Sequence, residues 1–93
     1  MMEQYEWDEA KRLQNVVKHG FDFVSLAEFV WDHALVVTDT RQDYGEMRLI
    51  AYGPLRGRIV VVVFSLRGEI RRIISLRKAN EREIRIYESR INN

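Results

Sequence analysis

Residues 70–83 read Ile-Arg-Arg-Ile-Ile-Ser-Leu-Arg-Lys-Ala-Asn-Glu-Arg-Glu, and this stretch says most about the fold. Its first eight residues interleave β-branched apolar side chains with arginines, which predicts a strand. Asn80, with Glu83 three residues later, then has the form of a capping box and predicts the start of a helix. The strand would hold a row of cations on a rigid surface, where they can bind an anion: Arg71, Arg72, Arg77 and Lys78.

Turn residues and changes of hydrophobic period divide the rest of the chain. Residues 5–7 alternate as a short strand, and residues 9–19 have helical spacing between an Asp8 cap and a Gly20 stop. Asp22 or Ser25 then caps a second helix that carries Phe23, Leu26, Ala27, Val30 and Trp31 on one face. The short connection predicts that these two helices form a hairpin.

Beyond residue 34 the period changes to two, and short turns separate the apolar runs. Strands are expected at residues 35–39, 47–52, 58–66 and 70–77, with a last helix from residue 80. We therefore predict one α+β domain over residues 1–93. An N-terminal strand and the helical hairpin would pack on a four-stranded antiparallel meander, followed by the C-terminal helix.

Composition limits the classes of protein that this chain can belong to. It has 93 residues, of which 46% are hydrophobic and 31% charged, as in a small soluble domain. Cysteine is absent, which excludes disulfides and thiolate metal sites and is compatible with a reducing cytosol. No apolar run approaches the ~18 residues of a membrane helix, so we expect a cytoplasmic protein without membrane contact. The aspartates lack metal-ligand spacing, and neither a metal nor another cofactor is expected: Asp22, Asp32, Asp39 and Asp43.

The net charge of +1 hides a strong asymmetry. Residues 1–40 carry three cations against eight carboxylates, whereas residues 41–93 carry twelve cations, eleven of them arginine, against six carboxylates. Such segregation suggests a polyanion partner, and arginine gives planar, bidentate contacts to phosphate. RNA is the anion we expect. The alternative is that the arginines only keep a small sheet soluble.

A series of short motifs runs through nearly the whole chain. It begins with Glu6-Trp7-Asp8-x-x-Lys11-x-x-x-Asn15-x-x-Lys18-His19-Gly20 and continues with Phe23, Ala27, Phe29-x-x-Asp32, Gly45-Glu46-x-Arg48 and Gly53. It ends with Arg58, Arg67-Gly68 and Ile70-Arg71-x-Ile73-Ile74-Ser75-x-Arg77-x-Ala79. In this order and spacing the motifs resemble the BrnT toxin family of type II toxin–antitoxin systems. Leu76 departs mildly, because the family usually has a small residue there.

The resemblance implies a RelE-like fold and a ribonuclease activity that halts translation. It also implies a BrnA-like antitoxin with a ribbon-helix-helix DNA-binding domain, so that operator DNA would be bound only through the antitoxin. We expect that antitoxin to cover Arg48, Arg71 and Arg77 with carboxylates.

A ribonuclease that works without a metal needs a base near the 2′-hydroxyl, an acid near the 5′-oxygen and cations at the phosphate. Strict alternation along residues 70–77 puts Arg71, Ser75 and Arg77 on one face, which we predict faces substrate. Arg72 would then share the opposite, core-facing side with apolar residues: Ile70, Ile74 and Leu76. Arg67 and Lys78 are expected to contact RNA from the strand ends.

His19 is the main candidate for proton transfer, although a His before a helix-stopping Gly also suits the helix dipole. Lys11 and Asn15 share its helix face, which is either an RNA contact or an ordinary solvated face. Glu46 and Arg48, two apart in a strand, would form an acid/base and phosphate clamp or a simple ion pair.

The remaining aromatic and histidine residues are weaker candidates. Tyr87 lies on the apolar stripe of the last helix, where it is either a core residue or a platform for an RNA base. Trp7 and Trp31 are expected in the core, and His33 is a second, less favoured acid–base candidate. Two other functions stay open: a non-catalytic nucleic-acid-binding module, such as a degenerate toxin acting as corepressor, and a structural subunit.

Overall fold

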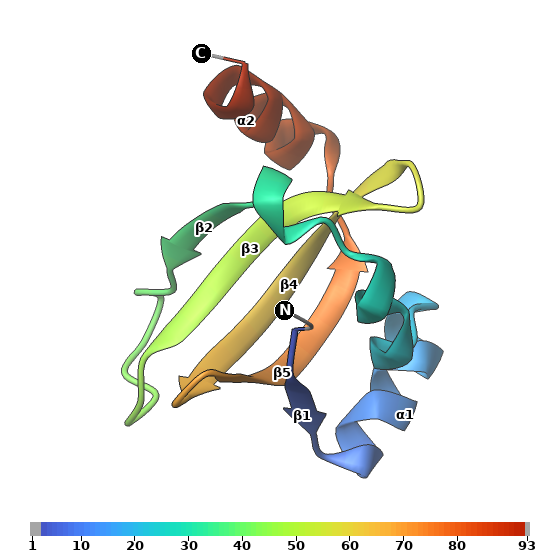
Figure 1. Cartoon of the computed structure of the whole chain (residues 1–93), viewed down its shortest axis with the longest axis vertical. Helices are drawn as coiled ribbons and strands as arrows, with labels where there is room; N and C mark the ends of the chain where they lie inside the picture. The colour runs from blue at the N-terminus through green and yellow to red at the C-terminus, as the bar shows by residue number, and fades with distance from the viewer. Residues whose placement is uncertain (1–2, 93) are drawn as a thin grey trace.

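A computed structural model describes residues 3–92 and shows an α+β fold built on one sheet of five strands (Figure 1). The strands are β1 (Tyr5–Trp7), β2 (Leu35–Thr38), β3 (Arg48–Leu55), β4 (Arg58–Arg67) and β5 (Ile70–Lys78). The α-helices are α1 (Glu9–His19) and α2 (Glu81–Ile91), and the 3₁₀ segments are η1 (Phe23–Glu28) and η2 (Trp31–His33). The predicted fold class is confirmed.

The sheet has the order β1-β5-β4-β3-β2 and is mixed. The last four strands form the expected antiparallel meander, with β2, β3, β4 and β5 paired in sequence. β1 adds a parallel strand to the free edge of β5, with Glu6 opposite Arg72. The N-terminal strand therefore extends the sheet instead of packing on it.

Both α-helices begin as the sequence predicts. The Asp8 carboxylate accepts hydrogen bonds from the backbone N–H of Ala10 and Lys11, and Gly20 ends α1 in the left-handed conformation with φ of 76°. At α2 the capping box is complete, because Asn80 and Glu83 each accept the backbone N–H of the other at 2.8–2.9 Å.

The predicted second α-helix is wrong, and so is the helical hairpin. Residues 23–28 and 31–33 form two 3₁₀ segments, separated where Phe29 is extended. Phe23, Leu26 and Phe29 are buried at a spacing of three, which is the period of a 3₁₀ helix and not of an α-helix. The Ser25 hydroxyl donates to the Asp22 carbonyl and does not act as a cap.

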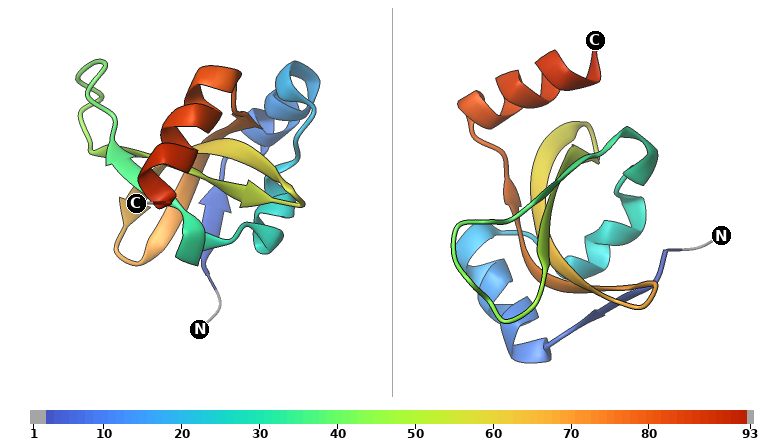
Figure 2. Two further views of the ribbon diagram at one scale, coloured as in Figure 1. Left: turned by 90° about the horizontal axis from the view of Figure 1, so that it is seen from above. Right: turned by 90° about the vertical axis from the view of Figure 1, so that its left-hand side faces the viewer.

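The two faces of the sheet pack against different elements. We call the face covered by η1 and η2 the inner face, and the face toward α2 the outer face. The inner face carries the larger core, to which η1 and η2 contribute Phe23, Leu26, Phe29 and Trp31. The outer face carries a smaller cluster around Ile50, Val61 and Val63, which Ile84 of α2 covers. Figure 2 shows η1 and η2 inside the curl of the sheet, with α2 on the other side.

Close packing on the inner face also explains one glycine. A Cβ at Gly53 would lie 2.7 Å from the ring of Phe29, which is closer than packed carbon atoms approach.

Within residues 3–92, no helix is long and apolar enough to cross a membrane.

Candidate functional site

The cationic surface of β5 is shaped by a bulge. Val63 of β4 pairs with Ser75, but Phe64 pairs with Ile73, so that Ile74 is an extra residue in β5. A bulge breaks the alternation of side chains along a strand. The alternation of faces is therefore different before and after Ile74. Ser75 and Arg77 share a face as predicted, but the predicted faces of Arg71 and Arg72 are wrong.

Arg71 lies on the inner face, contrary to the prediction that it shares a face with Arg77. Its guanidinium stacks on the Trp31 ring, with 3.8 Å from Cζ to the ring centroid, and forms an ion pair with Glu3. Only about a fifth (21%) of its side chain is exposed. Such a residue is held by the core and does not face open solvent on the outer side.

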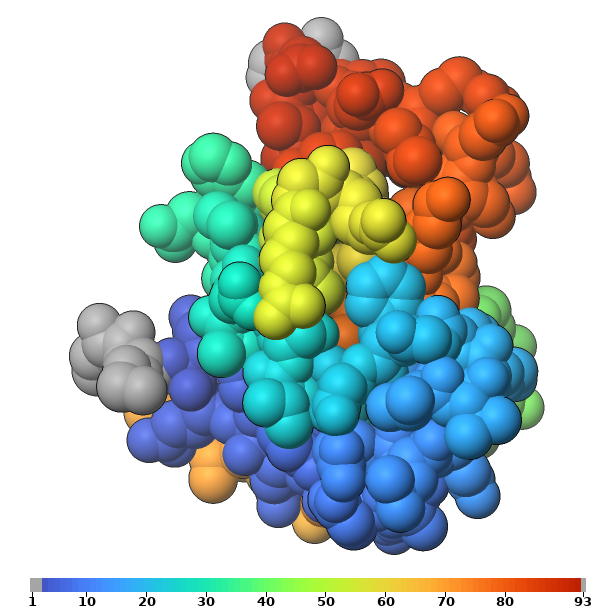
Figure 3. Space-filling view, turned by 90° about the vertical axis from the view of Figure 1, so that its right-hand side faces the viewer, coloured from blue at the N-terminus to red at the C-terminus, as the bar shows by residue number. Residues whose placement is uncertain are grey.

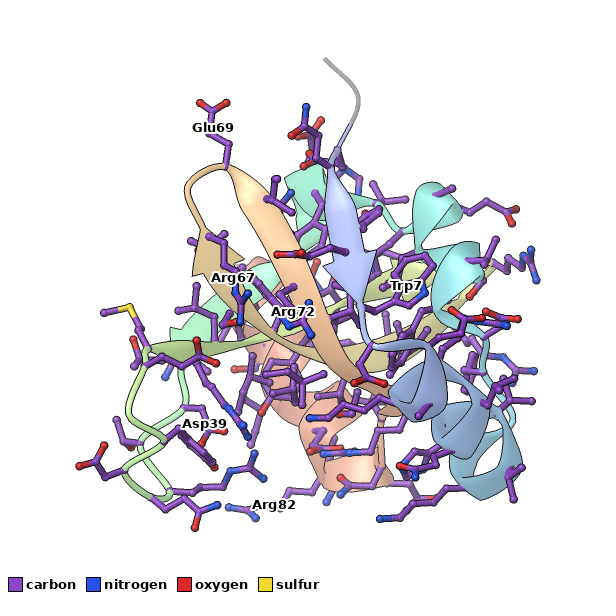
Figure 4. All side chains as sticks on the ribbon, turned by 90° about the horizontal axis from the view of Figure 1, so that it is seen from below. Trp7, Asp39, Arg67, Glu69, Arg72 and Arg82 are labelled. Atoms are coloured by element: carbon purple, nitrogen blue, oxygen red, sulfur yellow. The ribbon has the colours of Figure 1, made fainter. Side chains whose placement is uncertain are left out.

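Arg72 and Arg77 lie on the outer face. Arg72 is opposite Ser65 and Arg77 opposite Val61, and directly opposed residues share a face. The prediction that Arg72 lies on the core-facing side is therefore wrong. Arg67 and Arg72 both approach Glu6, at 3.9 and 3.5 Å, and Figure 4 shows the two arginines close together.

Helix α1 adds its own cations beside β5. A small open pocket lies between the helix and the strand, lined by Lys11, Gln14, Asn15, Lys18, His19, Ile74 and Ser75. Figure 3 shows α1 and α2 apart on this side, with the end of β5 between them. The structure thus brings together three candidate residues from different parts of the chain: Lys11, His19 and Ser75.

The electrostatics of His19 suit proton acceptance. Partial burial lowers the pKa of its imidazole, and the nearby charges of Lys18 and Arg77 lower that pKa further. The imidazole is therefore neutral at pH 7 and can accept a proton. Arg77 thus lies near enough to His19 for their charges to interact.

Arg77 is oriented by α2. Its two terminal nitrogens donate to the two carboxylate oxygens of Glu83, both at 2.8 Å. This pair raises the pKa of Arg77 and lowers the pKa of Glu83. The end of the guanidinium is occupied, but Nε–H has no partner among residues 3–92, and together with the second hydrogen of Nη2 it can still meet a phosphate from the side.

Asn15 has a structural role. Its side chain pairs with both backbone groups of Leu76, donating to the carbonyl at 2.7 Å and accepting the N–H at 3.1 Å, and it also donates to the Phe21 carbonyl. It continues the hydrogen bonding of the β5 edge beyond the end of β1. With the side chain buried and its amide engaged, we leave Asn15 out of the RNA contacts.

Tyr87 is also held inside the protein. It is buried, and its hydroxyl donates to the His33 carbonyl at 2.6 Å, which ties α2 to η2. The core alternative fits this placement better than base stacking does. His33 itself is exposed on η2, while Trp7 and Trp31 pack against the inner core as expected.

Glu46 and Arg48 do not share a strand. β3 begins at Arg48, so Glu46 lies in the preceding loop and the spacing argument for a clamp fails. Arg48 lies on the outer face opposite Ser65, and its guanidinium stacks on Tyr44 with 3.9 Å from Cζ to the ring centroid. Lys78 is exposed at the end of β5.

One member of the site was missed as a candidate, and another was placed on the wrong face. Lys18 is seven residues from Lys11, a spacing that brings both to one side of a helix, so the sequence contained the signal. Arg72 was assigned to the core-facing side because nothing in its neighbours marks the bulge. Among residues 3–92, no three His, Asp or Glu side chains lie close enough together to hold a metal ion.

Comparison with known proteins places this arrangement in a family. A search of curated proteins finds no match. A family model described as the ribonuclease toxin BrnT of type II toxin–antitoxin systems matches residues 7–83, which include the α1 pocket, the arginines of β5 and Glu83. This range covers most of the chain, and the protein therefore belongs to the BrnT family of ribonuclease toxins.

Proposed function

We propose that this protein is an endoribonuclease that cleaves RNA without a metal ion, using the 2′-hydroxyl of RNA as nucleophile. The observation that carries the proposal is the open pocket between α1 and β5, where His19, whose pKa is lowered, lies with Lys11, Lys18 and Ser75. A base beside several phosphate-binding cations is what this chemistry requires.

Residues in and near the pocket have distinct proposed roles. His19 accepts the proton of the 2′-hydroxyl, and Arg77 binds the scissile phosphate through its free fork, while Glu83 fixes its orientation. Lys11 and Lys18 offset the charge that develops on the phosphate, and Lys11 is our candidate donor to the 5′-oxygen. Ser75, at the floor of the pocket, can donate a hydrogen bond to a phosphate oxygen.

The cellular role is proposed from the family. Cleavage of RNA in the cytoplasm would arrest translation, and a BrnA-like antitoxin with a ribbon-helix-helix domain would neutralise the toxin and carry the complex to operator DNA. We propose that the antitoxin presents carboxylates to the outer face. An arginine that binds phosphate also binds a carboxylate through the same fork.

The test is incubation of the purified protein with RNA in EDTA at low salt. We expect cleavage by the wild type and its loss in H19Q and R77A. The matched control is R58Q, because Arg58 is exposed and pairs with Leu55 of the inner core, so it lies on the face opposite Arg77. Intact RNA after incubation with folded, monodisperse wild type would refute the ribonuclease activity.

One observation favours a second candidate. Glu83 already occupies the end of the Arg77 guanidinium, as a bound phosphate would. If that fork is the only one available to substrate, the protein is a non-catalytic nucleic-acid-binding module. This alternative predicts strongly salt-dependent RNA binding without cleavage, and no growth arrest on expression without the antitoxin.

A further inference from the structure

A row of three polar residues crosses the outer face away from the α1 pocket. Ser65 in β4 is paired with Arg48 in β3 on one side and with Arg72 in β5 on the other. Directly opposed side chains on a sheet have Cβ atoms about 5 Å apart, so both arginines lie within reach of the serine. Side chains from three neighbouring strands, β3, β4 and β5, thus lie side by side.

Two polar atoms in this row are buried without a partner. Ser65 is only 1% exposed, and its hydroxyl oxygen has no hydrogen-bond partner among residues 3–92. The Nε atom of Arg48 is also buried and has no hydrogen-bond partner among residues 3–92. Buried polar groups in folded proteins nearly always have a partner, and an orphaned one needs an explanation. Both orphans can donate a hydrogen bond, so they share a need for an acceptor.

The charge of this region favours an anionic acceptor. Arg48, Arg67 and Arg72 lie on this end of the outer face, and Glu6 is the carboxylate that approaches two of them. The Glu6 contacts are long, at 3.5 and 3.9 Å, and leave a cationic excess. Tyr44 under the Arg48 guanidinium holds that side chain in place.

We propose that Arg48, Ser65 and Arg72 form a phosphate-binding subsite for the RNA backbone, separate from the site of cleavage. This proposal rests on the proposed function, because RNA is inferred as the ligand from its proposed role as the substrate that binds the same face. Arg72 and Arg77 lie opposite Ser65 and Val61, which are four residues apart in β4, or roughly 13 Å along the sheet. One phosphate cannot bridge that distance, so the subsite takes another phosphate of the same RNA strand.

Binding of an RNA that cannot be cleaved tests the subsite. The probe is a mixed-sequence, fully 2′-O-methylated single-stranded RNA with a fluorescent label, titrated at several salt concentrations. We expect R48Q and R72Q each to weaken binding by about 3- to 10-fold and to reduce the slope of log Kd against log salt by about 0.7. S65A should weaken binding by about threefold without changing the slope, because it removes no charge.

The matched control is again R58Q, which removes the same charge from the opposite end of β4. It should change the Kd by less than about twofold. If R48Q, R72Q and S65A all bind like R58Q, the subsite does not exist. The activity assay in EDTA fails or succeeds independently, since cleavage depends on His19 and Arg77.

A second measurement does not depend on the stability of the variants. In the wild type, the NMR signals of the Arg48 Nε–H and the Ser65 backbone N–H should shift when the same RNA is added. Shifts confined to α1 and Arg77 would overturn the proposal.

Discussion

Arg71 and Arg72 are neighbours in β5, yet they belong to different parts of the molecule. Arg71 is packed on Trp31 in the inner face and paired with Glu3, whereas Arg72 lies on the outer face near Ser65 and Arg67. The inner arginine is surrounded by aromatic rings that leave little room for substrate. On the outer face, Arg67 and Arg72 share one carboxylate, Glu6, through contacts of 3.9 and 3.5 Å.

The number of arginines in a strand therefore does not measure the capacity of that strand to bind RNA. What matters is the face on which each guanidinium lies and what already occupies its forks. On the inner face, stacking and an ion pair make arginine part of the core. On the outer face, Arg77 keeps one fork free even though Glu83 holds the other.

The largest effect is expected from R77A, which removes the outer arginine closest to His19 in electrostatic terms. Loss of one preorganised donor at a phosphate should lower the cleavage rate by roughly 10²- to 10³-fold. The measurement is kcat/KM on a labelled RNA, with circular dichroism to show that the fold is kept. A rate within threefold of wild type would remove Arg77 from the catalytic site.

The next largest effect is expected on stability, from Asn15, whose side chain hydrogen-bonds the backbone at the edge of β5 between the two faces of the sheet. N15A leaves the backbone N–H and C=O of Leu76 without these partners, and should lower the free energy of unfolding by about 2–4 kcal/mol. Urea unfolding measures this. The exposed neighbour substitution Q14A is the control and should change stability by less than about 0.5 kcal/mol.

Most of the fold could be predicted because its signals are local. Asp8, Gly20, Asn80 and Glu83 act at the helix ends where the sequence places them. The segment 23–33 could not be predicted, because apolar residues three apart fit an α-helix and a 3₁₀ segment equally well. Burial of Phe23, Leu26 and Phe29 against the sheet selects the second.

The site was predicted less well than the fold. Lys11 and His19 share a helix, so their proximity follows from helical geometry, and their approach to Ser75 is the tertiary step. The faces of Arg71 and Arg72 depend on the bulge at Ile74, which is set by pairing with β4. Similarly, Asn15 can bind the backbone of Leu76 only because β1 ends before it reaches that residue. Leu76 is 61 residues from Asn15 in the sequence, so local patterns do not indicate this contact.

A smaller effect on rate is expected from H19Q, roughly 10²-fold, with a change in pH dependence that marks the base. Because the pKa of His19 is lowered, the wild-type rate should rise with pH, and the midpoint of the rise should lie below the ordinary histidine pKa of about 6.5. H19Q should lose this rise, whereas H33Q, at the exposed His33, should keep it.

The same pKa shift has a consequence for stability. Since the unfolded chain binds a proton at His19 more readily than the folded protein does, the folded state loses stability as pH falls through about 6.5. The H19Q protein should show a weaker loss in urea unfolding between pH 7 and pH 5. An unchanged pH dependence of both rate and stability would contradict the assignment of His19 as base.

The smallest effect separates the two neighbouring arginines directly. R71M removes the stack on Trp31 and the ion pair with Glu3 but keeps an apolar side chain against the rings, so we expect a loss of about 1–2 kcal/mol in unfolding free energy. RNA binding by the folded protein should stay within about twofold of wild type. R72M should show the reverse, with little change in stability and weaker, less salt-dependent RNA binding. If R71M also weakened RNA binding at full stability, the inner face would have to open to RNA, and the division of labour between the two faces of β5 would be wrong.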